Sequence, residues 1–333
     1  MTTPAFSSRL APVLTRYVGM KRALGRQFTS ATHSLLSLDR LLAKEPEAYP
    51  DLNAAAFRAW CKTEEHLASG VRRVRMLDVY NFCLYRRRTE PDCFLPDPLA
   101  FPSYHQRLRP YIFTESDVAR LLNAAAALKG TPSTPLRSEL TRLAIVLLFT
   151  TGIRRGELLN LTEGDYNRKD ATLHIRATKF YKSRLLPIHA GIADEIEKYL
   201  AARSRLRLPS SGSTPLIWNA TRGGRAYTGT GISYCIKPLL LQCGIAATNG
   251  KTPRIHDFRH SFAVNALLRW YRTGADVDAK LPLLATYLGH GSALSTHLSL
   301  HFIEPMRVAA SERFAKRYGP LIIPRAPKKG RAR

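Results

Sequence analysis

The chain has 333 residues and a formal net charge of +26, from 51 lysines and arginines against 25 aspartates and glutamates. Apolar residues make up 45% and charged residues 23%, which is ordinary for a globular protein and excludes a mostly disordered chain. So large a positive charge indicates a polyanionic partner, and a basic protein of a membrane surface is the competing interpretation. At about 150 residues per domain, the length predicts two domains.

Neither a membrane segment nor a disulfide framework is expected. The most apolar run, residues 140–149, is too short to span a membrane and contains Arg142, and the N-terminal residues lack the apolar core of a signal peptide. The five cysteines are scattered and never spaced as CxxC, which argues against disulfides and a zinc site. We therefore expect a soluble protein of a reducing compartment.

The first part of the chain is predicted to be helical. Apolar residues at near-helical spacing indicate one or two helices over 9–44, followed by helices over 52–68 and 70–88. The last of these is rich in arginine, which indicates either a solvated basic face or contact with a phosphate backbone. The candidates for such contact are Arg72, Arg73 and Arg75.

A proline-rich stretch over 93–110 interrupts the helical pattern, because proline is poorly tolerated inside helices. We predict that it is a linker. It divides the chain into a helical domain over 1–92, a second domain over 111–318 and a basic tail over 319–333.

The second domain is predicted to be mainly helical with a small antiparallel β-hairpin. Thr114-Glu-Ser-Asp117 resembles a capping box, and the apolar run over 138–150 predicts a buried helix that ends at Gly152. Two short strands, over 172–176 and 184–188, are expected to flank a basic turn. The turn contains Lys179 and Lys182, and further helices are predicted over 190–203, 229–243, 256–270 and 281–289.

Four segments of this domain carry groups that bind phosphate. They are Gly152-Ile-Arg154 with Glu157, Lys179 in the turn, His256-Asp-Phe-Arg259, and Leu288-Gly-His290. Each alone has an ordinary explanation: a structural salt bridge, a solvated turn lysine, or a capping histidine. Together they supply two arginines, a lysine and two histidines without a metal-binding cluster. Arginines grip phosphate oxygens and lysine or histidine transfers protons, so the set suits phosphodiester chemistry without a metal.

In this order and spacing, the four segments resemble the tyrosine recombinase, or phage integrase, family over roughly residues 111–318. The upstream helices are more loosely similar to the family's core-binding domain. The resemblance implies a mainly α, two-domain, C-shaped clamp around double-stranded DNA. It also implies site-specific recombination of mobile elements through a 3′-phosphotyrosyl intermediate, without metal or cofactor. The implied assembly is a homotetramer or mixed tetramer on a specific DNA site, in a cytoplasmic, nucleoid-associated bacterial protein.

The resemblance also implies a role for each matched residue. Arg154 and Arg259 would clamp the scissile phosphate. Lys179 would protonate the leaving 5′ oxygen from the hairpin. His256 and His290 would hydrogen-bond the phosphate and assist proton transfer.

The nucleophile position departs from the family pattern. The family has a tyrosine nine residues after the LGH histidine, and that position here is Ser299. A serine hydroxyl is closer to the backbone and far less acidic than a phenol, so we predict that this chain is cleavage-deficient. Tyr287 and Tyr318 lack the family spacing. Three interpretations stay open: a deliberate replacement that traps uncleaved DNA, a naturally inactive paralogue, or a nucleophile that is this serine or a tyrosine from elsewhere.

The alternative from another class is a non-catalytic DNA-binding accessory or regulatory paralogue of a mobile-element recombinase. Ser299 favours this alternative, whereas the retained arginines, lysine and histidines argue against it, because a pure DNA-binding protein does not need the full set. An RNA-binding protein is disfavoured, because the sequence has no aromatic strand motif of the kind that stacks RNA bases.

Overall fold

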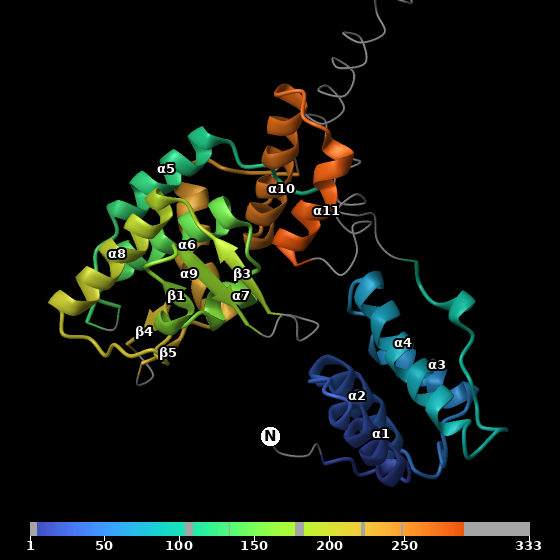
Figure 1. Ribbon diagram of the computed structural model, residues 1–333. Helices are drawn as coiled ribbons and strands as arrows, with labels where there is room; N and C mark the ends of the chain where they lie inside the picture. The colour runs from blue at the N-terminus through green and yellow to red at the C-terminus, as the bar shows by residue number, and fades with distance from the viewer. Residues whose placement is uncertain are drawn as a thin grey trace, which may run out of the picture. The chain divides into compact units, whose positions relative to one another are not determined.

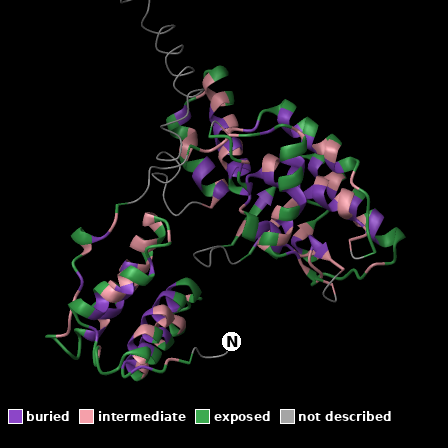
Figure 2. Ribbon diagram, turned by 180° about the vertical axis from the view of Figure 1, so that it is seen from behind, coloured by how far each residue is buried: buried purple, intermediate pink, exposed green. Residues whose placement is uncertain are grey.

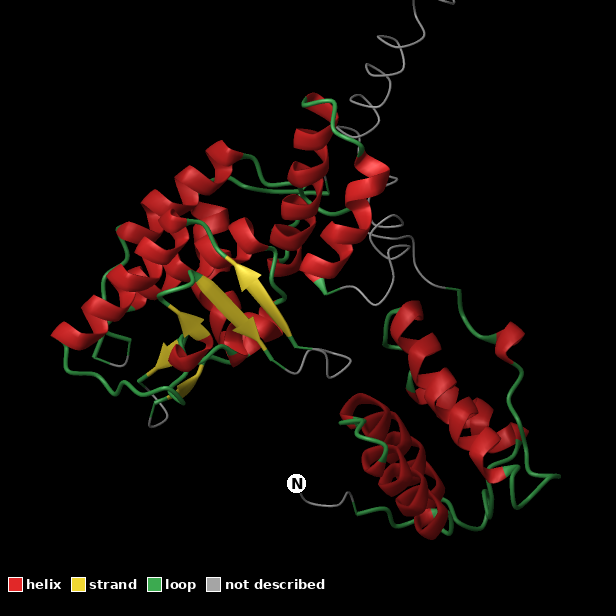
Figure 3. Cartoon of the chain, viewed as in Figure 1, coloured by secondary structure: helices red, strands yellow, loops and turns green. Residues whose placement is uncertain are grey.

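The computed structural model describes residues 5–289 apart from 104–108, 133, 177–182, 221–223 and 248. The chain divides into two compact units, Met1–Leu108 and Arg109–Arg333 (Figure 1). Helices dominate both units, and the strands of the described residues all lie in the second (Figure 3). This confirms the predicted class of a mainly helical protein with a small antiparallel sheet, while the closure of the two units as a clamp stays a prediction.

The first unit is a bundle of four helices around an apolar core. They are α1 (Ala11–Ala23), α2 (Thr29–Lys44), α3 (Ala54–Thr63) and α4 (Ser69–Arg86). Leu14, Leu35, Trp60 and Phe82 are fully buried between them. The predicted helical stretch over 9–44 is two helices, because Gly25 and Phe28 adopt positive φ angles that end one helix before the next begins.

The second unit is built around one buried helix. Its helices are α5 (Glu115–Ala126), α6 (Arg137–Thr151), α7 (Arg155–Asn160), α8 (Ala190–Arg205), α9 (Gly229–Gln242), α10 (Ile255–Arg272) and α11 (Val277–Leu288). Helix α6 is buried almost all round and packs against α5, α8, α9 and α10. In Figure 2 the buried residues accordingly concentrate on the faces that the helices turn toward one another. None of the helices in the described part of the chain is both long and apolar enough to cross a membrane.

Local sequence signals fix the start of α5 and the end of α6. Thr114 and Asp117 form the predicted capping box at the start of α5, with the Thr114 Oγ1 accepting from the Asp117 amide at 3.1 Å. Helix α6 ends where predicted, at Gly152, which has a φ of +62°. A β-carbon there would lie 2.7 Å from the ring of Phe262, so both the backbone angle and the packing require glycine.

The main sheet has the order β1-β2-β3 and is antiparallel. Its strands are β1 (Tyr166–Asn167), β2 (Thr172–Ile175) and β3 (Arg184–Pro187). The last two confirm the predicted hairpin, with Ile175 opposite Arg184 at the end of the ladder. The predicted turn residues Lys179 and Lys182 lie outside the described residues. A second, two-stranded sheet pairs β4 (Trp218–Asn219) with β5 (Arg225–Ala226).

Several elements differ from the sequence prediction. Helix α11 begins at Val277 rather than at residue 281, because the Asp276 carboxylate caps it by accepting from the Ala279 amide. The six-residue α7 and the two-residue strands β1, β4 and β5 were not predicted. A helix of fewer than two turns and strands of two residues are too short to leave a clear periodicity in a sequence.

Candidate functional site

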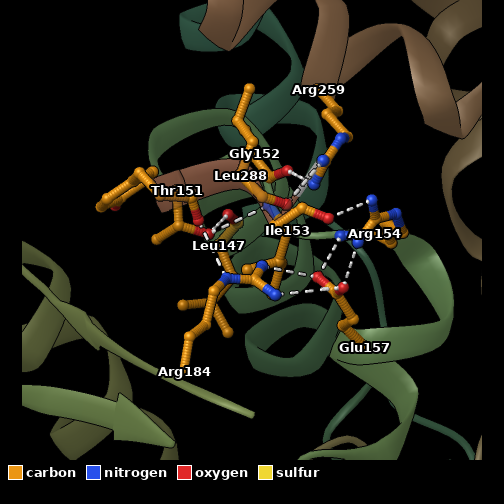
Figure 4. Close-up of polar contacts among 11 residues, drawn as sticks. Leu147, Thr151, Gly152, Ile153, Arg154, Glu157, Arg184, Arg259 and Leu288 are labelled. Carbon is orange, nitrogen blue, oxygen red and sulfur yellow. Dashed lines mark hydrogen bonds and ion pairs between the residues drawn. The ribbon is translucent and has the colours of Figure 1, made fainter. Parts of the chain in front are cut away.

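Three arginines converge in the second unit where several elements end. Arg154 precedes α7, Arg184 begins β3, and Arg259 lies in the first half of α10 (Figure 4). Each donates a hydrogen bond to a different carbonyl at the C-terminal end of α11. Arg184 Nε bonds the Tyr287 oxygen at 2.9 Å, Arg259 Nη2 the Leu288 oxygen at 2.6 Å, and Arg154 Nη2 the Gly289 oxygen at 2.8 Å. The last carbonyls of a helix have no partner within the helix and carry partial negative charge, so cations bind favourably there.

Arg154 is held by Glu157, three residues further along. The carboxylate accepts from the Arg154 amide at 3.0 Å and from Nη1 at 2.6 Å. Glu157 is almost fully buried, whereas a quarter of the Arg154 side chain stays exposed. The backbone and one guanidinium nitrogen of Arg154 are therefore held by Glu157, while part of the side chain stays exposed.

Arg184 shares the same carboxylate and was missed by the sequence analysis. Its Nη2 and Nη1 lie 2.9 and 3.3 Å from the two oxygens of Glu157 (Figure 4). A signal was available: Leu186, two residues on, is buried, and alternate strand residues share a face. A charged residue predicted to face inward needs a buried partner of opposite charge.

Burial and charge act in opposite directions on Glu157. Desolvation by burial raises its pKa, but hydrogen bonds from the Arg184 guanidinium and the Arg154 amide outweigh it, and the net pKa is lowered. Glu157 is therefore ionised at neutral pH and can serve both arginines.

In the described part of the chain, the hydrogen-bond partners of Arg259 include no carboxylate. Only 4% of the residue is exposed, and its Nη1 and Nη2 donate to the backbone oxygens of Gly152 and Leu288. Burial, followed by the positive charge of Arg154, lowers the pKa of Arg259 to about 9. The three arginines against one glutamate leave a local excess of positive charge. This arrangement favours binding of an anion with several oxygens.

Two histidines lie one turn apart on α10 next to this cluster. The rings of His256 and His260 are 4.8 Å apart and nearly perpendicular. Desolvation lowers the pKa of His256, and the charges of His260 and Arg259 lower it further, although the side chain remains exposed. Both histidines are thus neutral at pH 7, when each can donate or accept a hydrogen bond. The sequence analysis did not select His260.

Gly289 places the chain that leaves α11. It has a φ of +66°, and a β-carbon there would lie 2.7 Å from Arg184 Nη1 and 3.6 Å from Arg154 Nη1. Only glycine therefore allows the chain to pass this close to both guanidinium groups. The predicted site residues His290 and Ser299 follow this turn and lie outside the described residues, as Lys179 does.

The three candidate arginines of α4 lie in the first unit. Arg75 is paired with Glu64 at 2.5 Å, and Arg73 donates to the backbone oxygens of Phe101 and Pro102. Arg72 is partly buried. Two of the three guanidinium groups therefore hold the first unit together, whatever else they contact.

Comparisons with known proteins agree with this geometry. Residues 112–299 match the phage integrase family. The chain is 31% identical over 307 residues to the putative integrase/recombinase y4rB of Sinorhizobium fredii, covering 91% of this chain and 96% of that protein. It is 29% identical over 192 residues to tyrosine recombinase XerA of Thermococcus kodakarensis, covering 58% of each.

Solved structures show the same fold. XerH site-specific recombinase bound to difH substrate, in a pre-cleavage complex, superposes with a TM-score of 0.61 at 18% identity, covering 89% of this chain and 81% of that one. The mainly helical fold with its small antiparallel sheets is that of a tyrosine recombinase catalytic domain. The chain belongs to the phage integrase family of tyrosine recombinases.

Proposed function

We propose that the chain binds double-stranded DNA at a specific recombination site and is built for the strand transfer of an integrase or recombinase. The observation that carries the proposal is the cluster of Arg154, Arg184 and Arg259 with a single carboxylate between them. A phosphodiester is an anion whose oxygens can accept hydrogen bonds from such a cluster. The net charge of +26 favours a polyanionic binding partner for the whole chain.

The proposed roles follow from charge and from the family resemblance. Arg154 and Arg259 hold the non-bridging oxygens and stabilise the charge that builds up during attack. His256, neutral at pH 7 and exposed, hydrogen-bonds the same phosphate. Lys179, on the turn between β2 and β3, protonates the 5′ oxygen, and His290 assists from the chain that follows Gly289.

The chemistry of the family would be two transesterifications. A tyrosine oxygen attacks phosphorus, the bond to the 5′ oxygen breaks, and that oxygen takes a proton. A 5′-hydroxyl of a second duplex then reverses the step, which conserves the number of phosphodiester bonds. We propose that four subunits on two duplexes, each closed as a two-domain clamp, carry out this exchange.

Ser299 makes this chain a cleavage-deficient form in our proposal. Its hydroxyl is closer to the backbone than a tyrosine hydroxyl and much less acidic, so it neither reaches the phosphate nor ionises easily. The chain then binds and assembles on DNA without forming a covalent link.

The deciding experiment restores the phenol. A duplex enriched from a randomised library by binding to the unaltered chain is nicked at successive positions and incubated with the Ser299→Tyr variant. We expect an adduct that resists denaturation, with Tyr at 299 linked to a 3′-phosphate. The unaltered chain and a Ser295→Tyr control should give none. An adduct from the unaltered chain that maps to Ser299 would contradict cleavage deficiency.

The second candidate is a non-catalytic DNA-binding paralogue that regulates a mobile-element recombinase, and Ser299 is the observation that favours it. In that case Ser299→Tyr would bind the enriched duplex as the unaltered chain does but form no adduct on any nicked substrate. The same experiment therefore separates the two functions.

A further inference from the structure

We propose that Arg184 is a positioning residue of this site, which ties the lysine-bearing hairpin to the end of α11 through the carboxylate that also orients Arg154. This inference rests on the proposed function for its chemical consequence. Its structural part depends only on the contacts of Arg184.

Arg184 differs from the other two arginines because all three of its guanidinium nitrogens donate to protein acceptors. Nε donates to the Tyr287 oxygen, and Nη1 and Nη2 donate to Glu157. Only 13% of its side chain is exposed, against 25% for Arg154. Arg184 is thus occupied by the protein itself, so its contribution to a bound phosphate is made through its neighbours.

The first neighbour is the hairpin. Arg184 pairs with Ile175 at the end of the β2–β3 ladder, and Lys179 lies in the segment between these two residues. Because all three of its guanidinium nitrogens are hydrogen-bonded, Arg184 fixes the end of the segment that joins β2 to β3. Only four residues lie between Lys179 and Arg184, so the position of Arg184 limits where the lysine can reach.

The second neighbour is the end of α11. The bond to the Tyr287 oxygen lies two residues before Gly289, which itself packs against the Arg184 guanidinium. The chain toward His290 leaves from this point. Arg184 therefore contacts the starting points of both segments that carry the remaining candidate groups.

The third neighbour is Arg154, which Arg184 reaches through Glu157. Without Arg184, the carboxylate would neutralise Arg154 alone. With Arg184 present, one negative charge is shared between two guanidinium groups, and Arg154 keeps part of its charge for an anion.

The test uses Arg184→Lys, which keeps the charge but replaces the planar fork by a single ammonium. The matched control is Arg142→Lys, because Arg142 also binds a glutamate with two nitrogens, at 2.7 and 3.1 Å to Glu195, between α6 and α8. Thermal unfolding of both variants confirms that each is folded.

The structural measurement is native-state hydrogen exchange of the unaltered chain and the two variants, without DNA. In Arg184→Lys we expect exchange to accelerate about tenfold or more both in residues 184–187 and in 285–289, the two ends that the guanidinium joins. Arg142→Lys should leave both regions unchanged. Acceleration in only one of the two regions, or in neither, would overturn the inference, whether or not the chain cleaves DNA.

The chemical measurement is made in the Ser299→Tyr background. At saturating protein, Arg184→Lys should slow adduct formation about 100-fold, the scale expected for misplacing a catalytic group by about 1 Å. DNA affinity should change less than threefold. In a substrate whose 5′ bridging oxygen is replaced by sulfur, the leaving group is a thiolate, which needs no proton from the lysine. If Arg184 positions the lysine, this substrate should restore most of the rate of adduct formation that Arg184→Lys loses. An unchanged rate, or a loss that sulfur does not restore, would overturn this part. Absence of any adduct from Ser299→Tyr itself would count against the proposed function instead, and hydrogen exchange would still decide the positioning role.

Discussion

Two arginines of the second unit are almost equally buried but have very different surroundings. Arg203 in α8 is 1% exposed and Arg259 in α10 is 4% exposed. Arg203 forms an ion pair with Glu163 at 2.8 Å, donates to the oxygens of Pro209 and Pro215, and lies near the rings of Tyr199 and Trp218. Its charge is compensated within the protein.

Arg259 is surrounded by backbone oxygens and by other cations. Its guanidinium donates to two carbonyls, and burial followed by the charge of Arg154 lowers its pKa, while the charge of Glu157 acts in the opposite direction. A buried charge that is only partly compensated is costly, so such an arrangement is stabilised when an anion binds. The comparison teaches that burial alone does not distinguish the two arginines, whereas the presence or absence of a direct carboxylate partner among the described residues does.

The largest expected effect concerns the uncompensated arginine. In the Ser299→Tyr background, Arg259→Ala should slow adduct formation about 100- to 1,000-fold at saturating protein, the usual range for losing one donor to a transition-state charge. DNA affinity should fall far less, because most phosphate contacts lie elsewhere. Single-turnover cleavage and binding titrations measure the two quantities.

The opposite result for Arg259→Ala would contradict the contrast between Arg259 and Arg203. Loss of DNA binding with normal cleavage at saturating protein would show that Arg259 only anchors the duplex. The unfolding free energy provides a second check, since Arg259→Ala leaves two carbonyls without a donor and should cost no more than about 1–3 kcal/mol.

The compensated arginine should behave in the reverse way. Arg203→Ala leaves the Glu163 carboxylate, only 12% exposed, without its ion-pair partner and should lower the free energy of unfolding by about 3 kcal/mol. Cleavage per folded molecule should stay normal in the Ser299→Tyr background. Urea denaturation measures the loss, and Arg168→Ala is a control in which an exposed pair with Glu197 is broken with little effect. A stability loss no larger than that of Arg168→Ala would show that the charge of Arg203 is not needed for folding.

The parts of the fold that the sequence predicted are those set by nearby residues. The capping box of Thr114 and Asp117, the apolar helix before Gly152 and the β2–β3 hairpin each depend on contacts within about ten residues. The pairing of Arg154 with Glu157 is equally local, since Arg154 is the N-cap residue of α7 and Glu157 lies in the first turn of that helix.

The parts that were missed depend on distant segments. Arg184 meets Glu157 from 27 residues away and the Tyr287 oxygen from 103 residues away, and no local pattern encodes such contacts. The three successive carbonyls at the end of α11 are equally invisible, because backbone acceptors leave no trace in side-chain identity. Family resemblance supplied Arg259 as a candidate, but only the structure shows that its hydrogen-bond acceptors among the described residues are backbone oxygens.

The smallest expected effect concerns the single carboxylate of the arginine cluster, and it follows from the pKa of Glu157. The usual pKa is 4.5 and the folded value is lower, so ionised Glu157 stabilises the fold fully above pH 4.5. That contribution is lost as the pH falls through 4.5 and then through the lowered folded value. Glu157→Gln should therefore be less stable than the unaltered chain at pH 7, and the difference should shrink steadily toward about pH 3. Urea denaturation across this range measures it, with Glu47→Gln as an exposed control. A difference that stays constant with pH would mean that shape rather than charge holds the three arginines together, and the contrast with Arg203 would then lose its electrostatic basis.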